Sequence, residues 1–176
     1  MRRIKQPFDQ VEYGQDLMQE LALWFYKSRS AQKGVERRQL EGVVQKFFED
    51  TAGVLPNQAR LRAGSFIEYC AERAWLLTWV ARNERGEQLF TFTHRTFMEY
   101  FAATALARSS RSATDLAVQV RDAYKESASS VVPELIAQSA EYVYRGLGRE
   151  IIAALAVLER DLGLPRKGIY LALRVR

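Results

Sequence analysis

Apolar residues recur at helical spacing in three consecutive segments near the start of the chain. The spacing predicts amphipathic helices over residues 11–27, 36–50 and 65–77, with Gly53 and Pro56 ending the second. The apolar positions that carry the pattern are Leu17, Leu21, Trp24 and Phe25, then Leu40, Val43, Val44, Phe47 and Phe48, and then Phe66, Cys70, Ala74 and Leu77. The polar residues 1–10, which include Pro7, are expected to be a flexible lead-in.

The period of the pattern then changes from helix to strand. Residues 76–81 and 89–94 are rich in aromatic and β-forming side chains, and a short polar loop containing Gly86 separates them. This arrangement predicts a β-hairpin in which Phe90, Phe92 and His94 project to one face of the second strand. Three helices followed by a hairpin are the order of a winged-helix domain, which we place over residues 11–107.

A further helix is predicted directly after the hairpin. Thr96 and Glu99 fit the capping-box pattern, with Thr96 as the N-cap. Its buried side is expected to contain Phe97, Tyr100, Phe101, Thr104 and Ala105. The Arg/Ser-rich stretch 108–112 then marks a domain boundary.

The remaining residues, 112–176, predict antiparallel helices of the α-solenoid type. Ser112 and Asp115 offer a capping box for a helix reaching about residue 126, and Pro133 is suited to open the next helix. Gly146 and Gly148 should close that helix, and a final one should end at Gly163 and Pro165. Because the sequence stops in an apolar stretch, IYLALRVR, this helical repeat region is interpreted as truncated. The predicted fold is therefore mainly α, with one hairpin.

Composition narrows the function classes. The net charge of +5 permits nucleic-acid binding, but the arginines alternate with glutamates as on a solvated surface. The chain has one cysteine, Cys70, and one histidine, His94, so disulfide frameworks and zinc sites are not expected. We interpret Cys70 as a core residue. The sequence contains no signal peptide and no run of apolar residues long enough to span a bilayer, which favours a cytoplasmic location.

Catalytic motifs are missing from the sequence. It contains no G-x-x-x-x-G-K-[ST] phosphate loop, no dinucleotide-binding G-x-G-x-x-G and no G-x-S-x-G nucleophile elbow. We therefore expect no enzymatic activity, no metal and no cofactor within this chain itself.

One stretch carries a resemblance to a known family. In residues 87–106, EQLFTFTHRTFMEYFAATAL, the positions of Phe90, Phe92, His94, Thr96, Phe97, Glu99, Tyr100, Ala102 and Ala103 resemble the end of the winged-helix domain in NACHT-type STAND NTPases. In that family the position of Met98 usually holds glutamine. The stretch from Arg73 to Val80 also resembles the family's segment before the hairpin, but lacks its common glycine.

The resemblance implies a role in nucleotide-state sensing. The family's corresponding histidine contacts the β-phosphate of bound ADP, so His94 is the candidate cofactor-binding residue. That contact would require a nucleotide-binding domain in the same protein or parent chain, which would be an ATPase that binds ADP and ATP. The implied setting is signalling or antiviral defence, with a protein trigger and oligomerisation on activation.

A winged-helix DNA-binding transcriptional regulator is the alternative function. The helix before the hairpin would then enter the major groove, but its Glu68 and Glu72 would repel phosphate. In the hairpin loop, Glu84 and Glu87 offset the charges of Arg82 and Arg85. Trp75 and Trp79 are interpreted as packing residues, with the alternative that one of them covers a partner surface.

Overall fold

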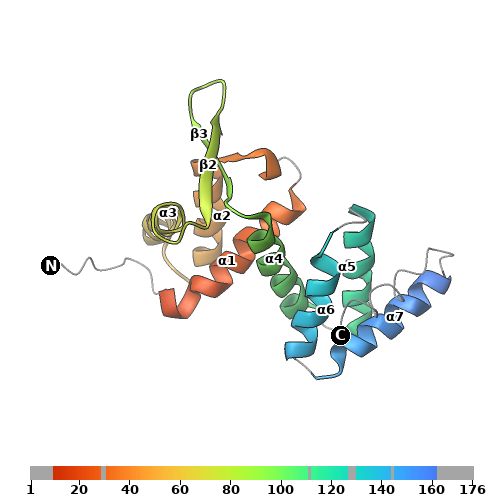
Figure 1. Cartoon of the computed structure of the whole chain (residues 1–176). Helices are drawn as coiled ribbons and strands as arrows, with labels where there is room; N and C mark the ends of the chain where they lie inside the picture. The colour runs from red at the N-terminus through yellow and green to blue at the C-terminus, as the bar shows by residue number, and fades with distance from the viewer. Residues whose placement is uncertain (1–9, 29–30, 111, 127–129, 144, 162–176) are drawn as a thin grey trace. The chain divides into compact units, whose positions relative to one another are not determined.

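The computed structural model describes residues 10–28, 31–110, 112–126, 130–143 and 145–161 (Figure 1). Over these residues the chain is mainly helical and contains a three-stranded antiparallel sheet. The predicted mainly helical class and the hairpin are confirmed. The chain divides into two compact units, residues 1–101 and 102–176, and the division falls inside the helix that follows the hairpin.

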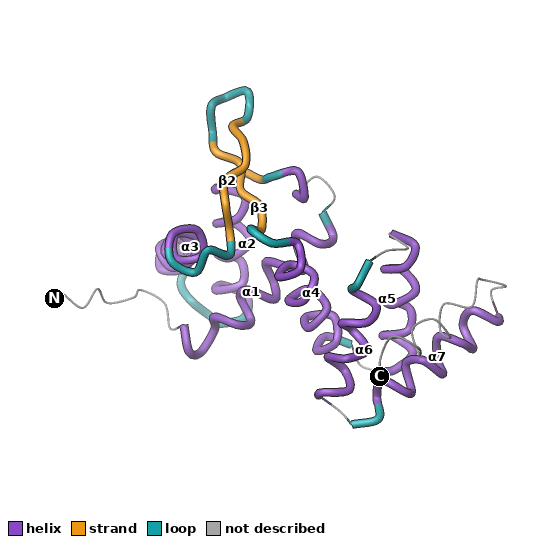
Figure 2. The backbone as a smooth tube through the Cα atoms, viewed as in Figure 1, coloured by secondary structure: helices purple, strands orange, loops and turns teal. Residues whose placement is uncertain are grey.

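The first unit combines helices with the sheet (Figure 2). Its elements are α1 (Gln10–Lys27), a 3-10 turn (Ala31–Lys33), β1 (Val35–Glu36), α2 (Arg37–Asp50), α3 (Pro56–Glu72), β2 (Leu77–Arg82), β3 (Gln88–Phe92) and the start of α4 (Arg95–Ser109). The predicted lead-in, residues 1–10, lies outside the described residues except for Gln10, which begins α1.

The predicted start of the third helix was wrong. This helix, α3, begins at Pro56, so Pro56 opens it instead of ending α2. Proline suits this position because the first amides of a helix have no partner within it. Ala59 and Ala63 are fully buried in this early part of the helix. Alanine is a weak marker of a core face, so the apolar pattern did not show the extension.

The sheet has the order β1-β3-β2, and β1 was not predicted. Val35 in β1 pairs with Phe90, and Leu77 in β2 pairs with Phe92. Gly34 leads into β1 with a φ of 111°, and a Cβ added there would lie 3.0 Å from the Cβ of Leu89. Only glycine therefore allows the chain to enter the sheet at this point.

The hairpin loop is organised by the side chain of Asn83. Its Oδ1 accepts hydrogen bonds from the amides of Arg85 and Glu87, at 3.0 and 2.9 Å. Its Nδ2 donates to Glu87 Oε2 at 2.9 Å and to Glu36 Oε1 at 2.8 Å. The first two bonds form the turn, and the last joins the hairpin to Glu36, the final residue of β1 and the N-cap of α2.

The core of the first unit lies where α1, α2 and α3 meet the base of the hairpin. The rings of Phe25 and Phe92 pack edge to face, with centroids 5.2 Å apart. The other buried apolar side chains include Leu17, Leu21, Leu40, Val44, Phe48, Phe66, Ile67, Cys70, Leu77 and Phe90. The prediction that Phe90 and Phe92 share one face of β3 is thus confirmed, and this face is the buried one.

The second unit is built from helices. It contains the end of α4 and then α5 (Ala113–Glu126), α6 (Val132–Val143) and α7 (Leu147–Asp161), with α5 in contact with both α6 and α7. Ser112 Oγ accepts a hydrogen bond from the amide of Asp115 at 3.1 Å, so its predicted capping role is confirmed. The buried apolar side chains include Leu116, Val120, Ile136, Ala140, Ile151 and Leu155.

The turn between α6 and α7 corrects one prediction. Gly146 lies in the turn with a φ of 94°, but Gly148 belongs to α7 and does not close α6. The carboxylate of Glu141 accepts hydrogen bonds from the amides of Gly146 and Gly148, both at 2.9 Å. Pro133 is the second residue of α6, not its first. The predicted end at Gly163 and Pro165, and the apolar stretch after them, lie outside the described residues.

Over the part of the chain that the structure describes, none of the helices is both long and apolar enough to cross a bilayer.

Candidate functional site

His94 lies in the connection between the sheet and α4. The sequence placed it in the second strand of the hairpin, but β3 ends at Phe92 and α4 begins at Arg95. Its backbone carbonyl accepts the hydrogen bond of the Phe97 amide at 3.1 Å, so His94 occupies the N-cap position. Its side chain is exposed, and its imidazole lies edge-on to the ring of Phe97 with centroids 5.4 Å apart.

The predicted capping box at Thr96 was wrong. Because His94 already occupies the N-cap, Thr96 lies within the first turn of α4, and its side chain is exposed. Glu99 is buried and forms an ion pair with Arg95, whose Nε lies 2.9 Å from Glu99 Oε1. The carboxylate of Glu99 therefore binds the side chain of Arg95, one turn earlier in α4, instead of capping the backbone.

The predicted buried side of α4 was also wrong at its start. Phe97 is 42% exposed and Tyr100 is 49% exposed, whereas Met98 and Glu99 are buried. Residues three apart in sequence lie along one side of a helix. His94, Phe97 and Tyr100 therefore form an exposed surface, which we call the histidine patch.

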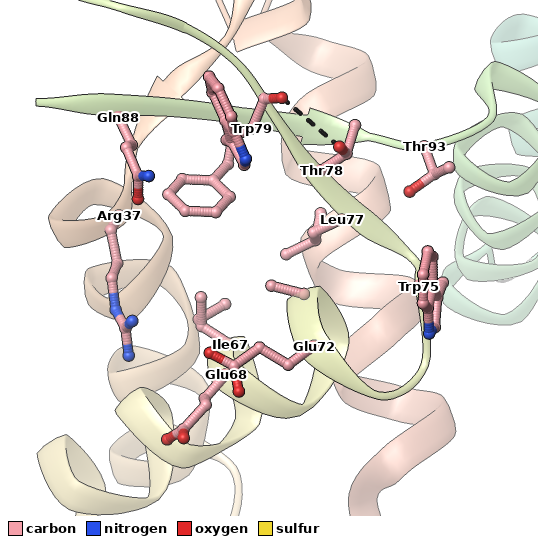
Figure 3. A pocket seen from close by; sticks show the side chains of 12 residues that line it. Arg37, Ile67, Glu68, Glu72, Trp75, Leu77, Thr78, Trp79, Gln88 and Thr93 are labelled. Carbon is pink, nitrogen blue, oxygen red and sulfur yellow. Dashed lines mark hydrogen bonds between the residues drawn. The ribbon is translucent and has the colours of Figure 1, made fainter.

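A second feature of the first unit is a groove between α3 and the sheet (Figure 3). Its volume is about 360 Å³. The lining comes from α2, α3, the turn after α3, both strands of the hairpin and the residue after β3 (Arg37, Ile67, Glu68, Ala71, Glu72, Trp75, Leu77, Thr78, Trp79, Gln88, Phe90 and Thr93). The sequence did not predict this groove, because its lining comes from segments far apart along the chain.

Trp75 lies at the end of the groove where α3 turns into β2. The amide of Leu76 returns to the carbonyl of Cys70 at 2.9 Å, and Trp75 adopts a φ of 54°. This left-handed conformation favours glycine, and a bulky residue in it costs about 1–3 kcal/mol. Trp75 is nevertheless 74% exposed, so its ring gains little from burial and the predicted packing role is wrong.

Trp79 is likewise uncovered, at 58% exposure. It lies on the same face of β2 as Leu77, which is buried, so the cover provided by the helices ends between these two positions. Trp79 pairs with Phe90, and the register shifts immediately afterwards so that Val80 has no partner in the ladder. A bulge of this kind bends the strand and re-aims its side chains.

The charges around the groove are unbalanced. Glu68 and Glu72 are exposed on α3, as the sequence predicted, and neither forms an ion pair within the described residues. The guanidinium of Arg37 is already engaged, because its Nε lies 2.7 Å from Glu41 Oε1 and its Nη2 donates to the carbonyl of Gly64 at 3.4 Å. The groove therefore presents two carboxylates that have no ion-pair partner among the described residues, because Arg37, the cation of its lining, is engaged by Glu41.

Cys70 is a core residue, as predicted. Its thiol is buried 3.6 Å from the sulfur of Met18, and burial raises the pKa of the Cys70 thiol to about 12. The thiol therefore stays protonated and is not a nucleophile at neutral pH. Across the described ranges, no group of three or more histidine, cysteine, aspartate or glutamate side chains is placed to hold a metal ion.

Comparison of this chain with protein-family models, with curated protein sequences and with solved structures gave no match.

Proposed function

We propose that this chain is a non-catalytic regulatory and coupling module of a NACHT-type STAND NTPase. In this proposal His94 senses bound ADP, and the parent protein acts in signalling or antiviral defence in the cytoplasm. The observation that carries the proposal is the exposure of His94, Phe97 and Tyr100, which form one surface immediately after the sheet.

The order of the elements supports a winged-helix assignment for the first unit. A helix, a short strand, two helices and a hairpin follow one another, and the short strand pairs with the second strand of the hairpin. These are the parts expected of a winged helix, with the hairpin as the wing. The mutual contacts of α5, α6 and α7 in the second unit support the start of a solenoid-like array.

The chemistry of the histidine patch suits a phosphate held by another domain. An exposed imidazole donates a hydrogen bond to an anionic oxygen, and protonation strengthens that bond. Phe97 and Tyr100 offer apolar area beside it for the nucleotide-binding domain. Arg95 is directed to Glu99 by their ion pair, so His94 is the residue of this segment assigned to the phosphate.

The first test is the coding sequence upstream of Met1. We expect an in-frame phosphate loop followed by a strand that ends in acidic residues. A stop codon directly upstream would contradict the proposal.

The second test is the rate of ADP release from the complete protein. His94→Ala should speed ADP release and raise the basal activity of the parent protein. The effect can be no larger than the difference in free energy that the His94 contact contributes to the ADP-bound state and to the activated state. Thr96→Ala is the matched control, because Thr96 is also exposed, lies two residues away and has no role in the proposed contact. Equal release rates in the wild type and in His94→Ala would refute the sensor role.

DNA binding remains the alternative function. Arg82, at the end of β2, and Arg85, in the hairpin loop, are exposed, which favours DNA binding. Glu68 and Glu72, however, are exposed on the helix that would enter the groove of DNA. A salt titration distinguishes the two functions, because DNA binding weakens steeply as salt rises. We expect no salt-dependent DNA binding by this chain.

A further inference from the structure

The groove between α3 and the sheet combines two exposed indoles with two carboxylates. Trp75 and Trp79 lie at different edges of it, and Glu68 and Glu72 project from α3 on another side (Figure 3). The histidine patch contributes no residue to this lining. The groove therefore has no part in the proposed contact with ADP.

We propose that this groove binds an arginine or lysine side chain carried by an extended segment of a partner protein. The cation would lie against the indole faces and use the carboxylates of Glu68 and Glu72 as counter-ions. The aliphatic stem would rest on the apolar floor formed by Ile67, Leu77 and Phe90.

The charge of the lining favours a cation. Within the described residues Glu68 and Glu72 have no ion-pair partner, and Arg37 is held by Glu41 and by the carbonyl of Gly64. A positive side chain is thus the missing complement to the two carboxylates. Indole rings attract cations through their negative faces, and arginine also stacks on them.

The shape and position of the groove favour a protein segment over nucleic acid. Two unpaired carboxylates repel a phosphate backbone, whereas an aliphatic stem with a charged end fits an apolar floor with an acidic rim. The sheet order also leaves β2 at an edge. An edge strand offers backbone hydrogen bonds to an extended segment that lies beside it.

The test is a titration followed by NMR of the tryptophan indole N–H signals. The probe is the peptide Ser-Thr-Arg-Val-Arg-Thr-Ser with an acetylated N-terminus and an amidated C-terminus. Single Trp→Phe variants assign the signals of Trp24, Trp75 and Trp79. The signals of Trp75 and Trp79 should shift and saturate below about 1 mM peptide. The signal of Trp24, which does not line the groove, should stay in place.

A second peptide isolates the contribution of charge. It replaces both arginines with citrulline, which has nearly the same shape without the charge, and it should bind about tenfold more weakly. The double variant Glu68→Gln/Glu72→Gln should weaken the arginine peptide similarly. Glu20→Gln is the matched control, because Glu20 is exposed on α1 away from the groove and should not affect binding.

Three outcomes would overturn the proposal. The first is the absence of any saturable shift at Trp75 and Trp79 with the arginine peptide. The second is equal binding of the citrulline and arginine peptides. The third is a shift of these signals on dilution of the chain alone, since a second copy would then occupy the groove. Because His94 has no part in this assay, its result is independent of the nucleotide-sensor proposal.

Discussion

The two units use aromatic side chains in different ways. In the first unit, the largest fully buried side chains include Phe25, Phe48 and Phe66, whereas leucine and isoleucine take this role in the second unit. The first unit also leaves aromatic rings uncovered around the groove and in the histidine patch. Among the described residues of the second unit, the large exposed hydrophobic side chains are Tyr142 and Val157.

The difference follows from what each unit is made of. Helices with small and aliphatic side chains pack along their whole length, so α5, α6 and α7 bury their apolar faces against one another. A hairpin that extends past its covering helices cannot bury the part beyond them, and Trp79 is exposed there. Both surfaces that we propose for binding therefore belong to the first unit.

The largest change in the free energy of unfolding is expected when a buried ring of the first unit is removed, in contrast to removal of an exposed ring. Phe25→Ala should lower the free energy of unfolding by about 3–5 kcal/mol, because it removes a fully buried ring and leaves a cavity beside Phe92. Phe97→Ala is the matched exposed change and should cost less than about 1 kcal/mol. Urea denaturation of both variants measures the two values. Equal losses would mean that Phe97 is not a surface residue.

A smaller change, which increases the free energy of unfolding, is expected for a substitution at Trp75. Trp75→Gly should raise the free energy of unfolding by about 1 kcal/mol, because the relief of the left-handed conformation exceeds the added chain entropy of glycine. The same change should abolish binding of the arginine peptide. Denaturation gives the stability, and the shift of the Trp79 signal gives the binding. A loss of stability would show that the exposed ring contributes packing.

Helix starts provide a comparison between the two units. Ser112→Ala should cost about 1 kcal/mol, because the Asp115 amide loses its partner at the start of α5. Thr96→Ala, for which the sequence predicted a similar loss, should stay within about 0.5 kcal/mol of the wild type. Thermal unfolding monitored by circular dichroism compares the two variants. A larger loss for Thr96→Ala would restore the predicted capping box.

The smallest expected effect is on the pH dependence of stability, to which one carboxylate in each unit contributes. The side-chain hydrogen bond from Asn83 lowers the pKa of Glu87, and the backbone hydrogen bonds from Gly146 and then Gly148 lower the pKa of Glu141. Both folded-state values lie below the ordinary value of 4.5. The stability that each carboxylate adds is therefore complete above that value and is lost as the pH falls through the lower folded-state pKa.

Glu87→Gln and Glu141→Gln should each make the acid dependence of the denaturation midpoint shallower. Midpoints measured from about pH 6 down to about pH 3 follow this change. An acid dependence identical to that of the wild type in both variants would show that these hydrogen bonds do not survive in solution.

Long periodic patterns made much of the fold predictable from the sequence. Helices α1 and α2 and the hairpin differ from the predicted ranges only at their ends, and Ser112 caps α5 as expected. The short strand β1 was missed because two residues are too few to show a period. The early part of α3 was missed because alanines form its buried side and a proline opens it.

The candidate sites were less predictable for a different reason. Periodicity shows which residues share a face, but it does not show where the neighbouring element that covers the face ends. Trp79 and Leu77 share a face of β2 with opposite burial, and Phe97 and Tyr100 share the exposed side of α4 where a core was predicted. The left-handed turn at Trp75 also lacks the glycine that would mark it in a sequence.

The pairing of β1 with β3 also bears on how the chain folds. Val35 and Phe90 are separated in sequence by α2, α3 and β2. A long loop must therefore close before β1 can pair with β3. The helices of the second unit contact one another across shorter stretches of chain, because α5 packs against α6 and α7, the next two helices. Contacts of low sequence separation form faster. During synthesis or refolding, the pairing of β1 with β3 should therefore be a late event, and the packing of the helices of the second unit an earlier one.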